Sequence, residues 1–91
     1  MVTDHSPRDY IKQRISILDY FPNARKTSRN GRWYSVLCPL HDDRNRSGWV
    51  DIERNRFGCQ SCINGSMDVI ELHARLNNVD NKTAIEELLK V

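Results

Sequence analysis

Three cysteines and one histidine constrain the fold of this chain more than any other feature of its sequence. Two residues separate Cys38 from His41, and two separate Cys59 from Cys62, so each pair can present its ligand atoms from one tight turn. Four such ligands complete the tetrahedral shell of a structural zinc ion. The two pairs together use all three cysteines of the chain. The spacing therefore predicts one structural zinc ion held by Cys38, His41, Cys59 and Cys62.

Other uses of these residues are less consistent with the sequence. A redox or disulfide role for Cys59 and Cys62 would fit a thioredoxin-like strand-helix-strand pattern, which does not surround them. A catalytic zinc ion needs an open coordination position, whereas here all four positions are filled. Asp42 and Asp43 are adjacent in a polar stretch and are interpreted as solvated side chains, not as paired catalytic carboxylates. We therefore predict no catalytic site on this chain.

The length of 91 residues suits a single domain, spanning 1–91, whose core alone would be modestly stable. A structural zinc ion can supply an apparent binding free energy on the order of 10–16 kcal/mol, so we expect metal binding and folding to be coupled. An odd number of cysteines argues against a disulfide framework, and no apolar run resembles a signal peptide or a membrane span. These features predict a soluble protein of the reducing cytoplasm.

Positive charge is concentrated around the predicted metal site. Residues 25–56 contain eight lysine and arginine residues against four acidic residues, and seven of the eight are arginine. Residues 66–91 contain five acidic residues against three basic residues. Because arginine is suited to planar, bidentate contacts with phosphates and bases, a polyanionic partner fits this distribution better than a membrane does. A charged face that is simply solvated is the alternative.

The N-terminal part of the chain is expected to be helical over residues 7–21. Ser6 and Pro7 are typical of a helix start, and apolar residues follow at helical spacing. Ser16 could cap a second helix, so either one helix or two short helices are expected. Pro22 ends the segment in either case, because the residue before a proline disfavours the helical conformation.

Residues 25–63 are expected to form a small antiparallel sheet of the zinc-ribbon type. The Asn-Gly pair at 30–31 predicts a type I′ turn between the first two strands, and the second strand covers residues 32–37. A third strand is expected over residues 49–52, followed by a turn at 54–55 and a return to the second cysteine pair. The metal would then join the ends of two hairpins.

Two C-terminal helices are expected over residues 66–90. Ser66 predicts the start of the first helix, Asn77-Asn78 predicts its end, and Asp80 or the next residue caps the second. The residues expected on the inner face of the first helix are Val69, Ile70, His73 and Leu76. Together the elements predict an α+β fold, a zinc ribbon with a small antiparallel sheet flanked by N-terminal and C-terminal helices.

Single-stranded nucleic acid could bind to this sheet, because arginines neutralise phosphates while unstacked bases lie on aromatic rings. We expect Arg32 and Tyr34, and likewise Arg54 and Arg56, to share a strand face and to point to solvent together. The predicted nucleic-acid-binding residues are Arg29, Arg32, Tyr34, Arg44, Arg46, Trp49, Arg54 and Arg56.

The remaining aromatic and histidine residues have simpler interpretations. Trp33 and Trp49 could each belong to the core or form an exposed stacking platform. Phe57 is expected in the core because it precedes a metal ligand closely. His73 is expected on a helix face with a local partner, and neither His73 nor His5 is needed as a ligand.

Several short motifs occur in an order known from one protein family. They are Cys38-Pro39-Leu40-His41, then Phe57-Gly58-Cys59-Gln60-Ser61-Cys62, then Gly65 leading into Met67-Asp68-Val69-Ile70. Over roughly residues 10–91 the chain resembles the N-terminal Cys-His-Cys-Cys zinc-binding domain of bacterial and phage DNA primases. The family commonly has a Thr-Pro-Ser-Phe-type stretch after the histidine. This chain has Asn45-Arg46-Ser47-Gly48 there instead, followed by Trp49.

The resemblance implies a zinc ribbon that binds single-stranded template DNA and assists primer initiation in DNA replication. Polymerising chemistry in that family belongs to a following domain, so the chain is expected to be the non-catalytic DNA-binding part of a primase, either a fragment or a free-standing relative. The implied partners are template DNA and a primase catalytic domain or a helicase. The alternative function is a zinc ribbon that docks onto a replication or regulatory protein.

Overall fold

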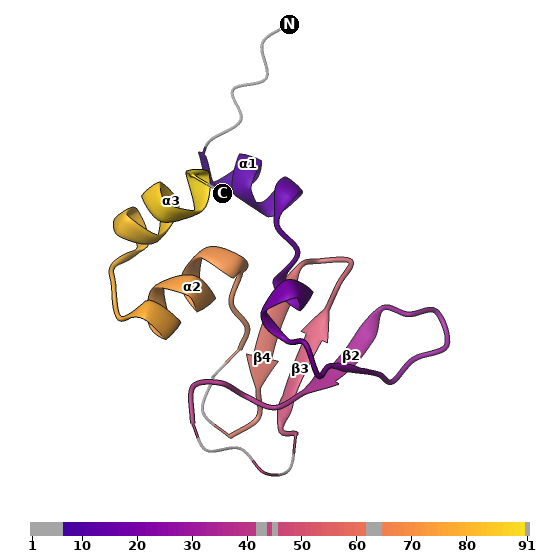
Figure 1. Ribbon diagram of the computed structural model, residues 1–91. Coiled ribbons are helices and arrows are strands. Elements are labelled where there is room, and N and C mark those ends of the chain that lie inside the picture. Colours follow the sequence, from indigo (N-terminus) through magenta and orange to yellow (C-terminus); the bar gives the residue numbers. More distant parts are fainter. Residues whose placement is uncertain (1–6, 42–43, 45, 62–64, 91) are drawn as a thin grey trace, which may run out of the picture.

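The structure, a computed structural model, has the predicted α+β fold and describes residues 7–41, 44, 46–61 and 65–90. Helix α1 (Pro7–Arg14) and the 3₁₀ helix η1 (Ile17–Tyr20) precede a sheet, and α2 (Val69–Asn77) and α3 (Asn81–Leu89) follow it. The strands are β1 (Arg25–Lys26), β2 (Trp33–Val36), β3 (Gly48–Asp51) and β4 (Arg56–Cys59). They pair antiparallel in the order β1-β2-β3-β4, and the three α-helices gather beside the sheet (Figure 1).

The N-terminal helical segment forms two short helices, which is one of the two predicted alternatives. Helix η1 begins after Ser16, whose hydroxyl oxygen accepts a hydrogen bond from the backbone N–H of Leu18 at 3.2 Å. The apolar residues Ile11 and Ile17 are at most 1% exposed and direct both helices towards the core. The predicted N-cap of α1, Ser6, lies outside the described residues.

The connection between β1 and β2 differs from the predicted type I′ turn. Such a turn needs positive φ at both central residues, but of this pair Gly31 alone has it, at 74°. The chain instead forms a longer loop over residues 27–32. In it, the Asn30 side chain accepts hydrogen bonds from Ser28 Oγ at 2.7 Å and from Arg32 N at 3.0 Å. These local bonds compete with the tight turn, which explains why a longer loop forms in its place.

The turn between β3 and β4 joins the N-terminal helices to the sheet. Asn55 has a left-handed φ of 57°, a conformation that asparagine tolerates well. Its side-chain amide donates to the backbone carbonyls of Lys12 at 3.2 Å and Ile15 at 2.9 Å, and its side-chain oxygen accepts from the N–H of Ile17 at 2.6 Å. One side chain therefore bonds to three backbone groups at the junction between α1 and η1.

Helix α2 begins at residue 69 and not at Ser66, the predicted start. Its N-cap is Asp68, whose carboxylate accepts a hydrogen bond from the N–H of Glu71 at 2.9 Å. The preceding residue, Met67, pairs with Phe57 through backbone hydrogen bonds of 2.8 and 2.9 Å. This pairing holds the chain extended beside β4, so the local serine signal is overridden by a contact between residues distant in sequence.

The remaining helix boundaries follow the local signals. Asn78 ends α2 with a left-handed φ of 54°, and Asp80 caps α3 by accepting a hydrogen bond from the N–H of Thr83 at 2.8 Å. The expectation that Leu76 lies on the inner face of α2 is wrong, because Leu76 is 38% exposed. Leu72 is fully buried in its place, which shows that the apolar face of α2 is rotated relative to the expectation.

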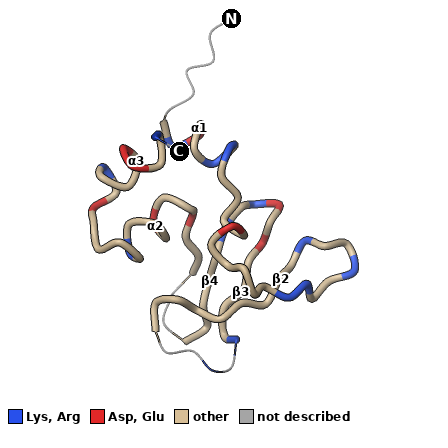
Figure 2. Tube along the Cα trace, in the orientation of Figure 1, with Lys and Arg blue, Asp and Glu red and all other residues tan. Residues whose placement is uncertain are grey.

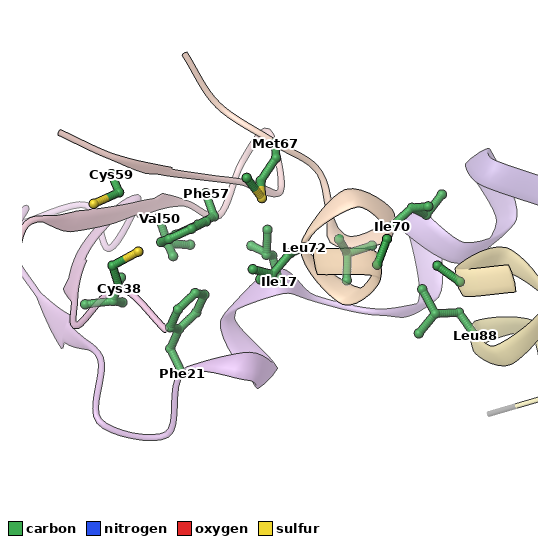
Figure 3. Packing of buried hydrophobic residues seen from close by; sticks show 14 of the residues in the cluster. Ile17, Phe21, Cys38, Val50, Phe57, Cys59, Met67, Ile70, Leu72 and Leu88 are labelled. Atoms are coloured by element: carbon green, nitrogen blue, oxygen red, sulfur yellow. The ribbon is translucent and has the colours of Figure 1, made fainter. Parts of the chain in front are cut away.

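One apolar core extends from the sheet to α3 (Figure 3). The rings of Phe21 and Phe57 pack with centroids 5.0 Å apart, and Phe57 is confirmed as a core residue with no exposed surface. Cys38 and Cys59 lie at one end of this core and Leu88 at the other. None of the described helices combines the length and the apolar composition required to cross a bilayer.

Candidate metal centre and basic face

Cys38, His41 and Cys59 converge at one end of the sheet. Their ligand atoms all lie within 4.8 Å of one another, and His41 Nε2 lies 3.3 Å from Cys59 Sγ. Zinc–sulfur and zinc–nitrogen bonds of about 2.3 and 2.0–2.1 Å at a tetrahedral angle would separate these two atoms by about 3.6 Å. The donor types and their spacing therefore fit a zinc ion. The fourth predicted ligand, Cys62, lies outside the described residues.

The strand order explains why ligands distant in sequence meet. Strands β2 and β4 both pair antiparallel with β3, so they run in the same direction and end at the same edge of the sheet. Cys38 follows β2 closely and Cys59 is the last residue of β4. Both cysteines are buried, whereas His41 is half-buried. A metal ion bound by these residues would connect the ends of the two strands.

Ser47, just before β3, contacts the site as well. Its hydroxyl lies 3.3 Å from Cys59 Sγ, and its backbone carbonyl accepts a hydrogen bond from the N–H of Gln60 at 3.1 Å. A hydroxyl that donates to a metal-bound thiolate orients the ligand and stabilises its negative charge. Ser47 is the serine that this chain shares with the Thr-Pro-Ser-Phe-type stretch of the resembled family. Its contact with Cys59 could not be predicted from the sequence, because Cys59 lies on another strand.

Arg32 forms an ion pair within the sheet. Its Nε and Nη2 donate to the two carboxylate oxygens of Asp51, each at 2.9 Å, and its Nη1 lies 3.6 Å from Glu53. Asp51 is 2% exposed, and the hydrogen bond from Arg32 outweighs burial and holds the pKa of this carboxyl below its usual value. The same hydrogen bond raises the pKa of Arg32. The expectation that Arg32 points freely to solvent is therefore wrong, because Asp51 binds it.

Arg46 and Arg56 also bond within the chain. Arg46 Nη1 donates to the backbone carbonyl oxygens of Asn23 at 3.0 Å and Ser35 at 3.2 Å. Arg56 donates to the hydroxyl and the carbonyl oxygen of Ser66, at 2.6 and 2.8 Å. Arg56 thus joins β4 to the segment entering α2, so the expectation that it turns to solvent is wrong. Whether either arginine contacts nucleic acid stays a prediction.

The exposed cations of the sheet region lie on β1 and on the loops between strands. Arg29, Arg44 and Arg54 are exposed, as their predicted binding role requires. Arg25 and Lys26 of β1 are exposed too, and Figure 2 shows basic residues along β1 and the loop that follows it. The predicted binding set omits these two residues. Their position before the Asn-Gly loop, in the same hairpin as Arg29, is the signal that could have included them.

The aromatic side chains divide between the two faces of the sheet. Tyr34 packs against the core, so the expectation that it points to solvent with Arg32 is wrong. Trp33, which is 39% exposed, and the half-buried Trp49 lie on the opposite face. Successive residues of a strand point to opposite faces, so Trp33 and Tyr34 cannot share one. The aromatic contribution of the outer face therefore comes from the tryptophans.

His73 has structural partners, as predicted for a helix-face histidine. Its Nδ1 lies 3.1 Å from the hydroxyl of Tyr20 and its Nε2 lies 2.8 Å from the carboxylate of Glu87, so it connects η1, α2 and α3. Burial of the Tyr20 phenol, together with the nearby Asp19 carboxylate, raises the pKa of Tyr20. The other discussed residues that lie outside the described part of the chain are His5, Asp42, Asp43 and Asn45.

The ligand pattern and the strand arrangement identify the family of the chain. A family model described as the CHC2 zinc finger matches residues 3–91. The chain belongs to the CHC2 zinc finger family. DNA primases of Mycoplasma pneumoniae and Staphylococcus epidermidis are 34% and 31% identical to this CHC2 domain, over 99% and 97% of its length. The domain spans 14% of the length of each of these relatives.

A solved structure supports the same assignment. The Aquifex aeolicus primase, in a crystal structure of its zinc-binding and RNA polymerase domains, matches this CHC2 domain with a TM-score of 0.76 and 27% identity. The match covers 94% of this chain and 21% of that one. The prediction of a primase-type zinc-binding domain is therefore confirmed.

Proposed function

We propose that this CHC2 domain binds single-stranded template DNA and presents it for primer synthesis by a DNA primase. The observation that supports the proposal is a set of exposed cations on β1 and on the hairpin loops of the sheet that carries the exposed Trp33. These cations are Arg25, Lys26, Arg29 and Arg54. Cations at this density can neutralise successive phosphates, and an exposed ring can stack on an unpaired base.

The proposed metal is one structural zinc ion held by Cys38, His41, Cys59 and Cys62. With four protein ligands, zinc would act as a structural centre and take no part in bond making. The chain's own residues would then bind the template. The hydrogen bond between Ser47 and Cys59 would keep the ligand cysteine oriented.

We further propose that the polymerising chemistry belongs to another domain of the cytoplasmic primase, and that this domain acts as a single unit over residues 1–91. The DNA primase relatives are much longer than this chain, which leaves room in them for such a domain. Partners of the assembled protein would be template DNA, the catalytic domain and a replicative helicase.

A fluorescence-anisotropy titration with a labelled single strand, repeated at several salt concentrations, tests the function. If about four phosphates are neutralised, the logarithm of the affinity should fall with the logarithm of salt concentration with a slope near −3, from about −0.7 per contact. The double variant Arg25→Ala/Arg29→Ala should flatten the slope by about 1.4. The control Lys82→Ala/Lys90→Ala removes the same charge from the α3 end of the chain and should leave the slope unchanged.

Arg32 and Arg56 are unsuitable for this test because each is bonded within the chain, so their loss would disturb the fold. Absence of binding at low salt would refute the proposed function. That result would favour the competing one, a zinc ribbon that docks onto a replication or regulatory protein.

A further inference from the structure

Two tryptophans meet on the face of the sheet that is turned away from the core. Val36 of β2 and Phe57 of β4 point into the core. Successive residues of a strand face opposite sides, so Trp33 of β2 and Gly58 of β4 lie on the other face. Trp49 of β3 pairs with Gly58 and lies on that face too. The two indole rings pack edge to face, with centroids 5.8 Å apart and planes at 63°. They form one aromatic contact across β2 and β3.

Trp49 packs directly against β4 at Gly58, which has no side chain. A Cβ atom at Gly58 would lie 2.3 Å from Cζ2 and 2.5 Å from Cε2 of Trp49, far inside contact distance. The indole of Trp49 therefore rests directly on the backbone of β4, and it is half-buried there. The Trp49 ring therefore has little freedom to move, and it supports the ring of Trp33.

Trp33 is fixed from a second direction by Arg32. The guanidinium carbon of Arg32 lies 5.0 Å from the centroid of the Trp33 ring, within the range of a cation–π contact. The guanidinium is itself held by its two hydrogen bonds to the buried Asp51. Trp33 is therefore restrained by two neighbours that are each anchored, yet 39% of its surface is exposed.

We propose that Trp33 is a stacking residue for an unpaired base of the single strand, with Trp49 and Arg32 as positioning residues. The inference rests on the proposed function and names the contact that it uses. A large apolar ring that is exposed but already ordered loses little conformational entropy when a flat ligand covers it. The exposed Arg25 on β1, with Arg29 and Arg54 in the hairpin loops of the same sheet, favours an occupant that carries negative charge beside its flat group, which a nucleotide does. Because every base has a π face, the contact would tolerate any sequence.

Binding of an oligothymidylate compared with an abasic oligomer of equal length separates stacking from charge. The two strands carry the same phosphates, so the tighter binding of the thymidylate strand measures the base contacts, expected to be roughly 5- to 150-fold for one stacked base. Trp33→Leu should bring the ratio of the two affinities, thymidylate strand over abasic strand, close to one and leave the affinity for the abasic strand unchanged. Trp33→Phe should restore part of the ratio, because it restores a ring.

A matched control is available on α1. Tyr10 is 45% exposed and also carries an arginine over its ring, with Arg14 Cζ 5.1 Å from the centroid. Tyr10→Leu should therefore not alter the ratio, because Tyr10 is not on the sheet. Zinc content and circular dichroism of each variant check that it folds. Since the chain has two tryptophans, Trp49→Phe leaves Trp33 as the single indole, and its emission should be quenched by the thymidylate strand.

The outcomes distinguish this inference from the function on which it rests. If both strands bind equally and the Trp33 emission does not change, Trp33 does not stack on bases, although the domain still binds a single strand. If neither strand binds at low salt, the proposed function fails and the stacking role fails with it. If Trp33→Leu lowers the affinity for both strands equally, Trp33 is a structural residue and the stacking role is refuted.

Discussion

Asn55 offers the sharpest test of how the sheet and the N-terminal helices are joined. Its side chain makes three hydrogen bonds to the backbone between Lys12 and Ile17, so Asn55→Gly removes all three and keeps the left-handed backbone conformation. At about 0.5–1.5 kcal/mol net for each bond, the free energy of unfolding should fall by about 1.5–4.5 kcal/mol. For a domain whose total stability is about 5–15 kcal/mol, this loss is large.

A second substitution at the same position separates the hydrogen bonds from the backbone conformation. Asn55→Ala removes the same bonds and also forces alanine into a left-handed φ of 57°, which should cost about 1 kcal/mol more. Asn78 provides the control, because it has a nearly identical φ of 54° and caps α2 through its backbone N–H. Asn78→Gly should change the stability by a few tenths of a kcal/mol at most.

Urea unfolding in excess zinc, followed by far-ultraviolet circular dichroism, gives the three free energies by linear extrapolation. Excess zinc keeps the metal contribution equal in all variants, so the differences report the side-chain contacts. If Asn55→Gly is no more destabilising than Asn78→Gly, the side chain of Asn55 does not join the helices to the sheet, and the reasoning from these bonds is wrong.

Three further predictions concern the metal, the buried ion pair and the tryptophan support. Chelation should abolish the cooperative unfolding transition and elemental analysis should find one zinc ion per chain, whereas unchanged melting after chelation would refute the coupling of metal and fold. The hydrogen bond from Arg32 lowers the pKa of Asp51. The stabilisation by this ion pair is therefore full above the unfolded-state pKa of about 3.9, and it is lost as the pH falls towards the lower pKa of the folded state. The stability difference between wild type and Asp51→Asn, measured by urea unfolding, should therefore shrink below about pH 4, and a constant difference would contradict this. Gly58→Ala should displace Trp49, shift the tryptophan emission and destabilise the domain by about 1–3 kcal/mol, whereas an unchanged spectrum would show that the ring is not held against β4.

Features that depend on neighbouring residues could be predicted from the sequence. The ligand spacing around Cys38 and Cys59 predicts a metal site, and three of its members meet in the structure. Asp80 caps α3 and Ser16 caps η1 because each bonds to a backbone N–H within three residues. Such signals need no knowledge of the tertiary fold, so they are visible in one sequence.

Features that depend on distant partners could not be predicted in the same way. Asn55 is recognisable as a turn residue, but its partners lie 38 to 43 positions earlier in the chain. Ser66 is a good local cap, yet the pairing of Met67 with Phe57 delays the helix. Arg32 reads as a free surface charge until the register of β2 and β3 brings Asp51 beside it. The contact is set by strand pairing for Ser66 and Arg32, and by the docking of the N-terminal helices against the β3–β4 turn for Asn55.

Three arginines near the sheet bond within the chain, which alters the salt dependence expected for binding of a single strand. Arg32, Arg46 and Arg56 are drawn into bonds that join strands, loops and the start of α2, so part of the positive charge stabilises the fold. A cation already bonded to a buried carboxylate releases few counterions when a phosphate approaches, because its charge is neutralised beforehand. Arg32 is bonded in this way to Asp51, and Arg46 and Arg56 are held by uncharged oxygens that restrict their reach. The salt dependence should therefore be smaller than all eight basic residues of this region would give. A slope well beyond −3 would mean that the bonded arginines exchange their internal partners for phosphates when a single strand binds.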